Sequence, residues 1–199
     1  MQQARSRWRG GTLTDSQGFT FGTLIITGFG TINGTQHSLG YHGAIITASG
    51  GELTINGDIY VSNIPQIAAG ATFDMEGSTL RSPIQGDPHI AGPLAYKFLS
   101  DSGTLSLGNA SARQSFEANG VIAGMNVSTT GLASTVLHLA DMMASSITSA
   151  SVVSGNAIEL FSGSTMTDQF NLASNVGSAV VHWAPDSTGS GTNVFLSTH

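Results

Sequence analysis

Two carboxylates stand two residues apart in the segment FDMEG, at Asp74 and Glu76. If this segment is a strand, both side chains lie on one face, because alternate residues of a strand point to the same side. Their backbone positions are then about 6.5 Å apart, within the range at which paired carboxylates flank a glycosidic bond during hydrolysis. Glu52 and Asp58 flank a neighbouring segment that could approach them. Asp74 and Glu76 are therefore weak candidates for catalytic residues, and the alternative is that all four are solvated acids at strand ends.

The histidines give weaker indications of chemistry. Asp87 and His89 in GDPHIAG could orient a proton-transfer group, although Asp-Pro is also ordinary turn chemistry. His138 and His182 fall at equivalent positions of a repeat, where we expect packed or hydrogen-bonded imidazoles rather than metal ligands. The sequence contains no cysteine, phosphate-binding loop, nucleophile elbow or zinc-protease motif. We therefore expect no metal and no cofactor, and we favour a non-enzymatic protein.

The charged residues are few and unevenly placed. Only six basic and twelve acidic residues occur among 199, and Arg5, Arg7 and Arg9 surround Trp8 near the start of the chain. We predict that residues 1–19 form a basic docking arm ahead of an acidic body, and the alternative is a frayed tail. The body has no basic patch to neutralise phosphates, which argues against nucleic acid as a partner. No apolar run approaches the roughly 18 residues of a membrane span, and the first residues lack the apolar core of a signal peptide.

Short segments recur at intervals of 20 to 23 residues. The triplet IIT at residues 25–27 returns 20 residues later, and the tetrad TING at residues 31–34 returns 23 residues later. A second family of segments begins at residues 133, 155 and 177, a spacing of 22. Strands as short as these are unstable as isolated hairpins, whereas stacked coils bury a shared core. With 40% hydrophobic residues to fill that core, the chain is predicted to be an all-β protein of stacked coils.

In these repeat columns, and in the echo of IIT and TING, the chain resembles the pectin-lyase-like right-handed parallel β-helix family. The closest likeness within that family is to bacteriophage tailspikes and virion spike proteins. The resemblance implies about eight or nine short coils, with a first β-helical stack over residues 20–83 and a second over 119–199, which ends in a C-terminal loop and strand. Residues 84–118 follow a proline-rich stretch that interrupts any ladder, and we expect an irregular loop or crossing segment there. A jelly-roll-type β-sandwich is the main alternative fold.

The 22-residue repeat also predicts a contact surface. One parity of its strands starts with a β-branched residue in every copy and is expected to face the interior. The other parity then places Leu139, Phe161 and Trp183 in an outward ladder of large apolar side chains. Exposed apolar ladders mark contacts with another surface, and phage β-helix proteins are commonly parallel homotrimers. The resemblance therefore implies self-association through this ladder, unless the parity is reversed and the ladder is core.

Together these features predict a non-enzymatic structural protein of a phage virion: a β-helical spike, fibre or head-decoration protein. The arm would dock on other virion proteins of the capsid or tail, and the body would trimerise at the particle surface. The first alternative is a small tailspike-like polysaccharide depolymerase, either a glycoside hydrolase or a lyase. Such an enzyme would act on host surface polysaccharide through Asp74 and Glu76. The second alternative is a fragment of a bacterial surface adhesin.

Overall fold

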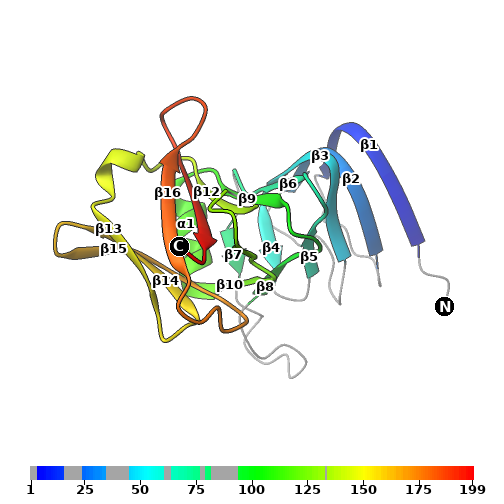
Figure 1. The fold of residues 1–199 in the computed structure, drawn as a ribbon. Helices are drawn as coiled ribbons and strands as arrows, with labels where there is room; N and C mark the ends of the chain where they lie inside the picture. Colours follow the sequence, from blue (N-terminus) through cyan, green and yellow to red (C-terminus); the bar gives the residue numbers. More distant parts are fainter. Residues whose placement is uncertain are drawn as a thin grey trace, which may run out of the picture.

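The computed structural model describes residues 4–15, 24–34, 45–60, 64–76, 79–81, 94–132 and 134–199. Strands dominate these residues, so the all-β prediction is confirmed. One helix, α1 (Ala110–Asn119), and one turn of 3-10 helix, η1 (Ala144–Ser146), interrupt the strands. Figure 1 shows that the chain starts at one end of the molecule, at β1, and finishes among the strands of the opposite half.

Parallel strands build the first half of the molecule. β1 (Ala4–Asp15), β2 (Leu24–Gly34) and β3 (Ile45–Asn56) pair in parallel in that order. The two halves of β3 then have different neighbours: β5 (Ile64–Ile67) pairs with the first half and β6 (Thr72–Asp74) with the second. The chain therefore returns in the same direction at each pass, and the sheet branches and curls at β3.

Two rows of parallel strands continue from this branch. The row through β5 continues to β8 (Leu94–Phe98) and then to β10 (Gly120–Ala123). The row through β6 continues to β9 (Gly103–Leu107) and then to β12 (Thr135–Leu139). Since a jelly roll is built from antiparallel strands, this pairing does not fit the alternative fold. A separate parallel pair consists of β4 (Asp58–Tyr60) and β7 (Thr79–Arg81).

The IIT and TING repeat of the N-terminal strands is also a structural repeat. Ile25 is the register partner of Ile45, and Thr31 is the partner of Thr54, so each segment of β2 lies beside its copy in β3. A register shift after Gly28 absorbs the three-residue difference between the two spacings. The prediction that these segments stack on one another is confirmed.

The predicted second stack over residues 119–199 is wrong for its later part, because the chain reverses there instead of coiling. β13 (Ser149–Val153), β14 (Ala157–Ser162) and β15 (Thr165–Asn171) form a separate antiparallel sheet. Ser154 and Gly155 have φ values of 53° and 72°, the left-handed backbone that tight hairpins require. The turn they form sends β14 back along β13.

Antiparallel pairing also ends the parallel sheet. β17 (Thr192–Ser197) pairs in antiparallel fashion with β12 on one side and with β16 (Val180–Pro185) on the other. A short parallel contact adds β11 (Val127–Ser128) to β17. The 22-residue spacing of the segments that start at 133, 155 and 177 therefore does not mark stacked coils.

The predicted irregular segment 84–118 is wrong over residues 94–118, which form β8, β9 and most of α1. The helix begins at Asn109, whose side chain accepts a hydrogen bond from the backbone nitrogen of Ala112 at 2.9 Å, as an N-cap residue does. Ala112 and Phe116 lie one helical turn apart and are both fully buried. These two side chains hold α1 against the sheet.

An aromatic row joins the two halves of the molecule through the core. Phe73, Tyr96, Phe116 and Phe170 are all fully buried, and successive ring centroids are 5.5, 5.2 and 6.4 Å apart. The four rings come from β6, β8, α1 and β15 respectively. The parallel strands and the C-terminal antiparallel sheet therefore share one hydrophobic core.

The residues of the predicted docking arm belong to the sheet. Arg5, Arg7, Trp8 and Arg9 lie in β1, opposite residues 25, 27, 28 and 29 of β2. Among the strands that the structure describes, β1 pairs with β2 alone, so it is an edge strand. The docking role of this strand stays a prediction.

Candidate functional site

Four neighbouring parallel strands each place one polar residue in a line across the sheet. Thr54 of β3 lies opposite Asp74 of β6, Asp74 lies opposite Ser106 of β9, and Ser106 lies opposite His138 of β12. The residues just before them fill the core and have no exposed surface: Leu53, Phe73, Leu105 and Leu137. Because alternate residues of a strand face opposite sides, the line of polar side chains lies on the outer face.

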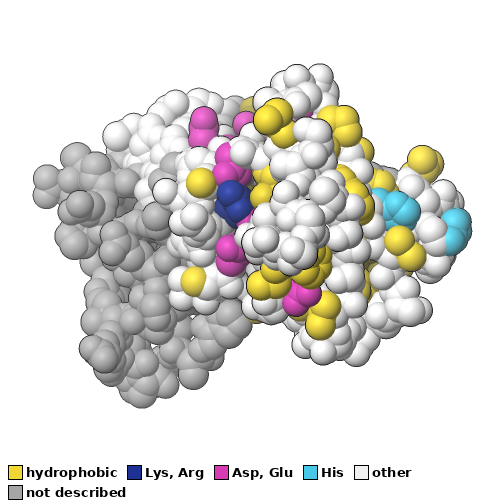
Figure 2. Space-filling view, turned by 90° about the vertical axis from the view of Figure 1, so that its left-hand side faces the viewer, with side chains coloured by type: hydrophobic (Ala, Val, Ile, Leu, Met, Phe, Trp, Pro, Cys, Tyr) yellow, Lys and Arg dark blue, Asp and Glu magenta, His cyan; other side chains and the backbone are white. Residues whose placement is uncertain are grey.

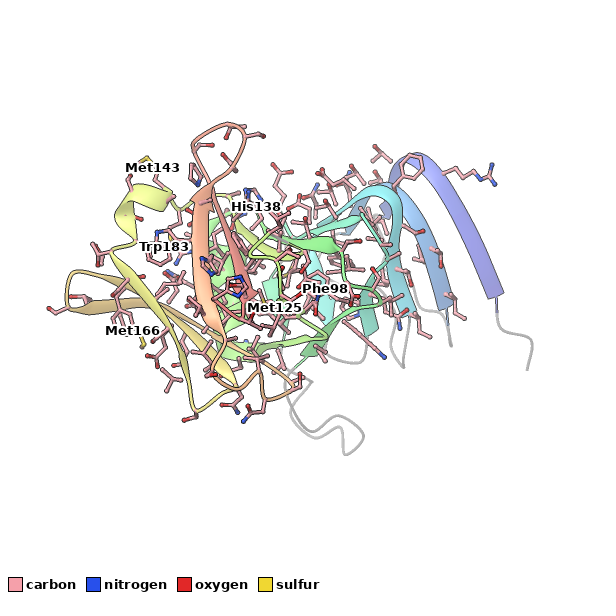
Figure 3. All side chains as sticks on the ribbon, viewed as in Figure 1. Phe98, Met125, His138, Met143, Met166 and Trp183 are labelled. Carbon is pink, nitrogen blue, oxygen red and sulfur yellow. The ribbon has the colours of Figure 1, made fainter. Side chains whose placement is uncertain are left out.

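A groove of about 530 Å³ covers this line. The loop between β16 and β17 contributes Asp186, Ser187 and Thr188 to its lining and protrudes beyond the sheet in Figure 1. Figure 3 shows His138 at the base of this loop. The lining contains no aromatic side chain and is rich in carboxylates and hydroxyls, at Glu52, Thr72, Asp74, Glu76, Thr104, Ser106, Asp186, Ser187 and Thr188. The groove is therefore polar and acidic.

Asp74 is the most buried carboxylate of the groove, with 8% of its surface exposed. Burial raises the pKa of its carboxyl group, a hydrogen bond with Ser106 opposes that rise, and the charges of Glu52 and Glu76 add to it. Asp74 therefore keeps its proton to a higher pH than an exposed aspartate does. A carboxyl group in that condition is suited to act as a general acid.

A hydrogen-bonded chain leads from Asp74 to the loop. Ser106 contacts Asp74, and its Oγ lies 3.2 Å from Nδ1 of His138. Nε2 of His138 lies 3.2 Å from Oδ2 of Asp186. If Asp74 is ionised, it can only accept, so Ser106 donates to it and Nδ1 donates to Ser106. If Asp74 is protonated, every donor in that chain reverses, so one proton can sit on Asp74 or on His138.

This arrangement differs from a serine nucleophile with its base. In a nucleophilic triad the serine hydroxyl gives its proton to the histidine, whereas ionised Asp74 takes the hydrogen of Ser106 and leaves none for His138. The chemistry that the groove can support is therefore proton transfer between carboxyl groups and His138, or hydrogen bonding to a hydroxyl-rich ligand.

Asp186 fixes the loop as well as the histidine. Its Oδ1 accepts hydrogen bonds from the backbone nitrogens of Thr188 and Gly189, at 3.0 and 2.6 Å, and from the Thr188 hydroxyl at 2.8 Å. Although desolvation alone would raise it, these bonds and those from Gly191 and His138 lower the pKa of Asp186 to about 2. Asp186 is therefore an anionic anchor that ties the loop to β12.

Glycine is required where this loop crosses the groove. A Cβ atom on Gly191 would lie 2.7 Å from Oδ2 of Asp186 and 2.7 Å from Nε2 of His138. Carbon atoms do not approach polar atoms this closely without displacing them. The small size of Gly191 thus allows the contact between Asp186 and His138.

Glu76 is held at the opposite side of the groove by the start of α1. Nδ2 of Asn109 donates a hydrogen bond to the backbone oxygen of Glu76, while its Oδ1 caps the helix. A Cβ atom on Gly108 would lie 2.5 Å from Cα of Glu76, so only glycine permits this approach. The position of the Glu76 backbone therefore depends on Gly108 and Asn109.

The sequence correctly placed Asp74, Glu76 and Glu52 together but missed their partners. Asp58 lies in β4 and is not part of the groove lining, and Asp87 and His89 lie outside the described residues. Ser106 and His138, which complete the groove, follow Asp74 at two steps of 32 residues. A signal for them exists: the patterns Phe-Asp-Met, Leu-Ser-Leu and Leu-His-Leu recur at this spacing, each with one polar residue between two buried ones.

The predicted outward ladder of Leu139, Phe161 and Trp183 is wrong. Leu139 has no exposed surface, and Trp183 packs half-buried against the core. β12 and β16 are separated by β17, and Phe161 belongs to the separate sheet of β14. In Figure 2, the hydrophobic side chains on the face toward the viewer form several groups among polar ones rather than one row.

His182 also lies apart from the groove. Its ring stacks on that of Phe195, with centroids 5.3 Å apart, and its Nε2 lies 2.7 Å from Oγ of Ser197. Both histidines of the supposed repeat are thus hydrogen-bonded, but they are on strands that flank β17 and have different partners.

Comparison with models of protein families, with curated proteins and with solved structures finds no match to this chain. Within the described ranges, no helix is long and apolar enough to cross a membrane. The same residues contain no group of three or more His, Cys, Asp or Glu side chains arranged to hold a metal ion. The interpretation of the groove therefore depends on its own geometry.

Proposed function

We propose that this chain is a non-enzymatic surface protein of a phage particle that binds a polysaccharide of the host in the groove beneath the β16–β17 loop. The proposal includes a right-handed parallel β-helix as the form of the stacked strands. The observation that carries it is the groove itself, whose floor and loop present hydroxyls and carboxylates over successive parallel strands. Sugar hydroxyls both donate and accept hydrogen bonds, so such a lining is complementary to them.

The charge of the groove narrows the class of polysaccharide. Glu52, Asp74, Glu76 and Asp186 outnumber the single histidine in the lining, so anionic polysaccharides would be repelled. The expected ligand is a neutral polysaccharide or one that carries amino groups.

The binding test uses immobilised surface polysaccharides that are anionic, neutral and amine-bearing. The full chain is expected to bind neutral or amine-bearing polymers, and Glu76→Gln to bind them about tenfold more weakly, about 1.4 kcal/mol. Glu159→Gln on β14, away from the groove, is the matched control and should bind as the parent does. Retention only by anionic polymers, or equal loss in both variants, would contradict the proposal.

Attachment to the particle is proposed for β1. Its support is the position of Arg5, Arg7 and Arg9 on an edge strand, where backbone groups can pair with a strand of another protein. Gold labelling of the protein on intact particles should locate it on the capsid or tail. Replacement of the three arginines by serine should abolish binding to particles that lack the protein, and unchanged binding would contradict docking by this strand.

Polysaccharide cleavage is the second candidate, and the raised pKa of Asp74 beside Glu76 favours it. Asp74 would protonate the glycosidic oxygen, and Glu76 or Glu52 would activate water or stabilise the developing charge on the sugar. Release of reducing ends from a polysaccharide that the protein binds, abolished in Glu76→Gln, would establish cleavage and overturn the non-enzymatic proposal.

A further inference from the structure

A second carboxyl pair lies where α1 meets β15, and none of its residues lines the groove. The side chain of Asp168 on β15 has no exposed surface, and its Oδ1 accepts a hydrogen bond from Nη1 of Arg113 on α1. Arg113 also donates to Asp141, from Nε at 3.1 Å and from Nη2 at 2.9 Å. A single guanidinium is thus shared by two carboxylates.

The other oxygen of Asp168 has no such partner. Within the described part of the chain, Oδ2 is fully buried and accepts no hydrogen bond. A buried anionic oxygen without a donor is costly, so a positive group is expected beside it. Asp168 lines a pocket of about 380 Å³ together with Gln114, Glu117, Thr167, Gln169 and Asn171.

The negative charge at this pocket exceeds what the chain neutralises. Glu117 is a second carboxylate of the lining, and its Oε1 accepts a hydrogen bond from the backbone nitrogen of Gln169 at 3.3 Å. Burial and the adjacent Asp168 raise the pKa of Glu117 to about 7, which shows how strongly the two carboxyl groups oppose a common negative charge. With Asp141 included, three carboxylates face one arginine.

We propose that this pocket is a calcium site, in which Oδ2 of Asp168 and the carboxylate of Glu117 bind the ion directly. Every side-chain ligand available is an oxygen, which favours a hard cation such as Ca²⁺ over zinc or copper. Oxygens of Gln114, Thr167 and Asn171, with water, would complete the six to eight ligands that calcium takes. Two carboxylates in an open pocket correspond to a weak site, with Kd on the order of 10⁻⁴ to 10⁻³ M.

The ion would connect the two halves of the molecule. Glu117 belongs to α1, which packs on the parallel strands, whereas Asp168 belongs to the C-terminal antiparallel sheet. Binding to the folded form alone would raise the temperature of unfolding. The proposal is independent of glycan binding, since its residues lie in a different pocket.

The experiment is calorimetric titration of the full chain with CaCl₂ at pH 8 after treatment with EDTA, paired with thermal unfolding. We expect one ion per chain and a Tm about 2–4 °C higher at 10 mM calcium. Glu117→Gln should bind calcium at least tenfold more weakly. Without calcium this variant should unfold at a higher temperature than the parent, because its amide can donate to Oδ2 of Asp168.

Glu76→Gln is the matched control, since it removes one carboxylate from the groove and leaves this pocket intact. It should bind calcium as the parent does. The proposal is overturned if the parent gives neither heat nor a shift in Tm, if Glu117→Gln binds calcium unchanged, or if Glu76→Gln loses binding to the same degree. An equal response to MgCl₂ would overturn the assignment to calcium.

Discussion

Nδ2 of Asn56 donates a hydrogen bond to Oδ1 of Asn33 over 2.9 Å, between two side chains that are register partners in the parallel strands β3 and β2. Each amide carries both a donor and an acceptor, so asparagines at the same position of successive parallel strands can bond in a column. This contact ties the third residue of one TING segment to the third residue of the next.

The asparagine pair should therefore stabilise the stacking of β2 on β3. Asn33→Ala and Asn56→Ala should each lower the free energy of unfolding by about 1 kcal/mol, and the double variant should lose less than the sum. Urea unfolding of the three variants measures this coupling. Additivity within about 0.3 kcal/mol would mean that the bond contributes nothing.

Tyr96 buries a hydroxyl that has no hydrogen-bond partner among the described residues. Tyr96→Phe keeps the ring contacts with Phe73 and Phe116 and removes the desolvated oxygen, so the free energy of unfolding should rise by about 1 kcal/mol. Tyr96→Leu, which removes the ring, should lower it. A loss of stability in Tyr96→Phe, measured by chemical unfolding, would show that the hydroxyl is bonded.

Asp74 should make stability fall as pH rises. Its folded-state pKa is raised above 3.8, so the folded state favours the protonated carboxyl, and the stability present below the unfolded pKa is lost as pH rises through the folded value. Asp74→Asn should therefore raise the free energy of unfolding at pH 7 and leave it nearly unchanged at pH 3. The exposed Asp101→Asn is the control, and an equal effect at both pH values would contradict the prediction.

Gly191→Ala should separate the β16–β17 loop from β12. The added Cβ meets Asp186 and His138 at 2.7 Å, so either side chain must move and their contact breaks. We expect a lower Tm and polysaccharide binding at least tenfold weaker. Ser190→Ala, at the neighbouring position of the same loop, should leave both unchanged, whereas a parent-like Gly191→Ala would mean that the loop tolerates the displacement.

Leu139 should behave as a core residue. Leu139→Ala is expected to lower the free energy of unfolding by about 2–5 kcal/mol, because the side chain is completely buried. Self-association, for which we propose a trimer, must then use other residues, such as Met143 or Met166, which point outward in Figure 3 and are 58% and 48% exposed. Light scattering should give a trimer for the parent and for Met143→Ser a smaller species, and a monodisperse parent monomer would end the trimer proposal.

The sequence was sufficient for the strands whose repeats are identical in letters. IIT and TING fall in adjacent parallel strands because the same side chains fill the same layer at each pass. The 22-residue family misled because alternation of apolar and polar residues is the same in parallel and antiparallel strands. Direction is set by the turns, and the left-handed pair Ser154 and Gly155 reverses the chain there.

The groove was half visible in the sequence. Asp74 and Glu76 are close in the chain, so local alternation was enough to put them on one face. Ser106 and His138 join them only through the lateral pairing of β6, β9 and β12, and the 32-residue steps include turns, other strands and α1. Spacing of this kind carries little similarity between steps. The helix was detectable, since Asn109, Ala112 and Phe116 have the spacing of a capped helix with one buried face.

The antiparallel pairing of β17 with β12 gives the stack of strands a direction of growth. At this end the row that starts at β6 is closed, because a strand that runs the opposite way occupies the edge where another parallel pass would be added. At the other end β1 still presents an edge of the same polarity as every pass before it. Related proteins of greater length would therefore be expected to insert their extra passes on the β1 side, and the groove would keep its distance from the capped end whatever the length of the shaft.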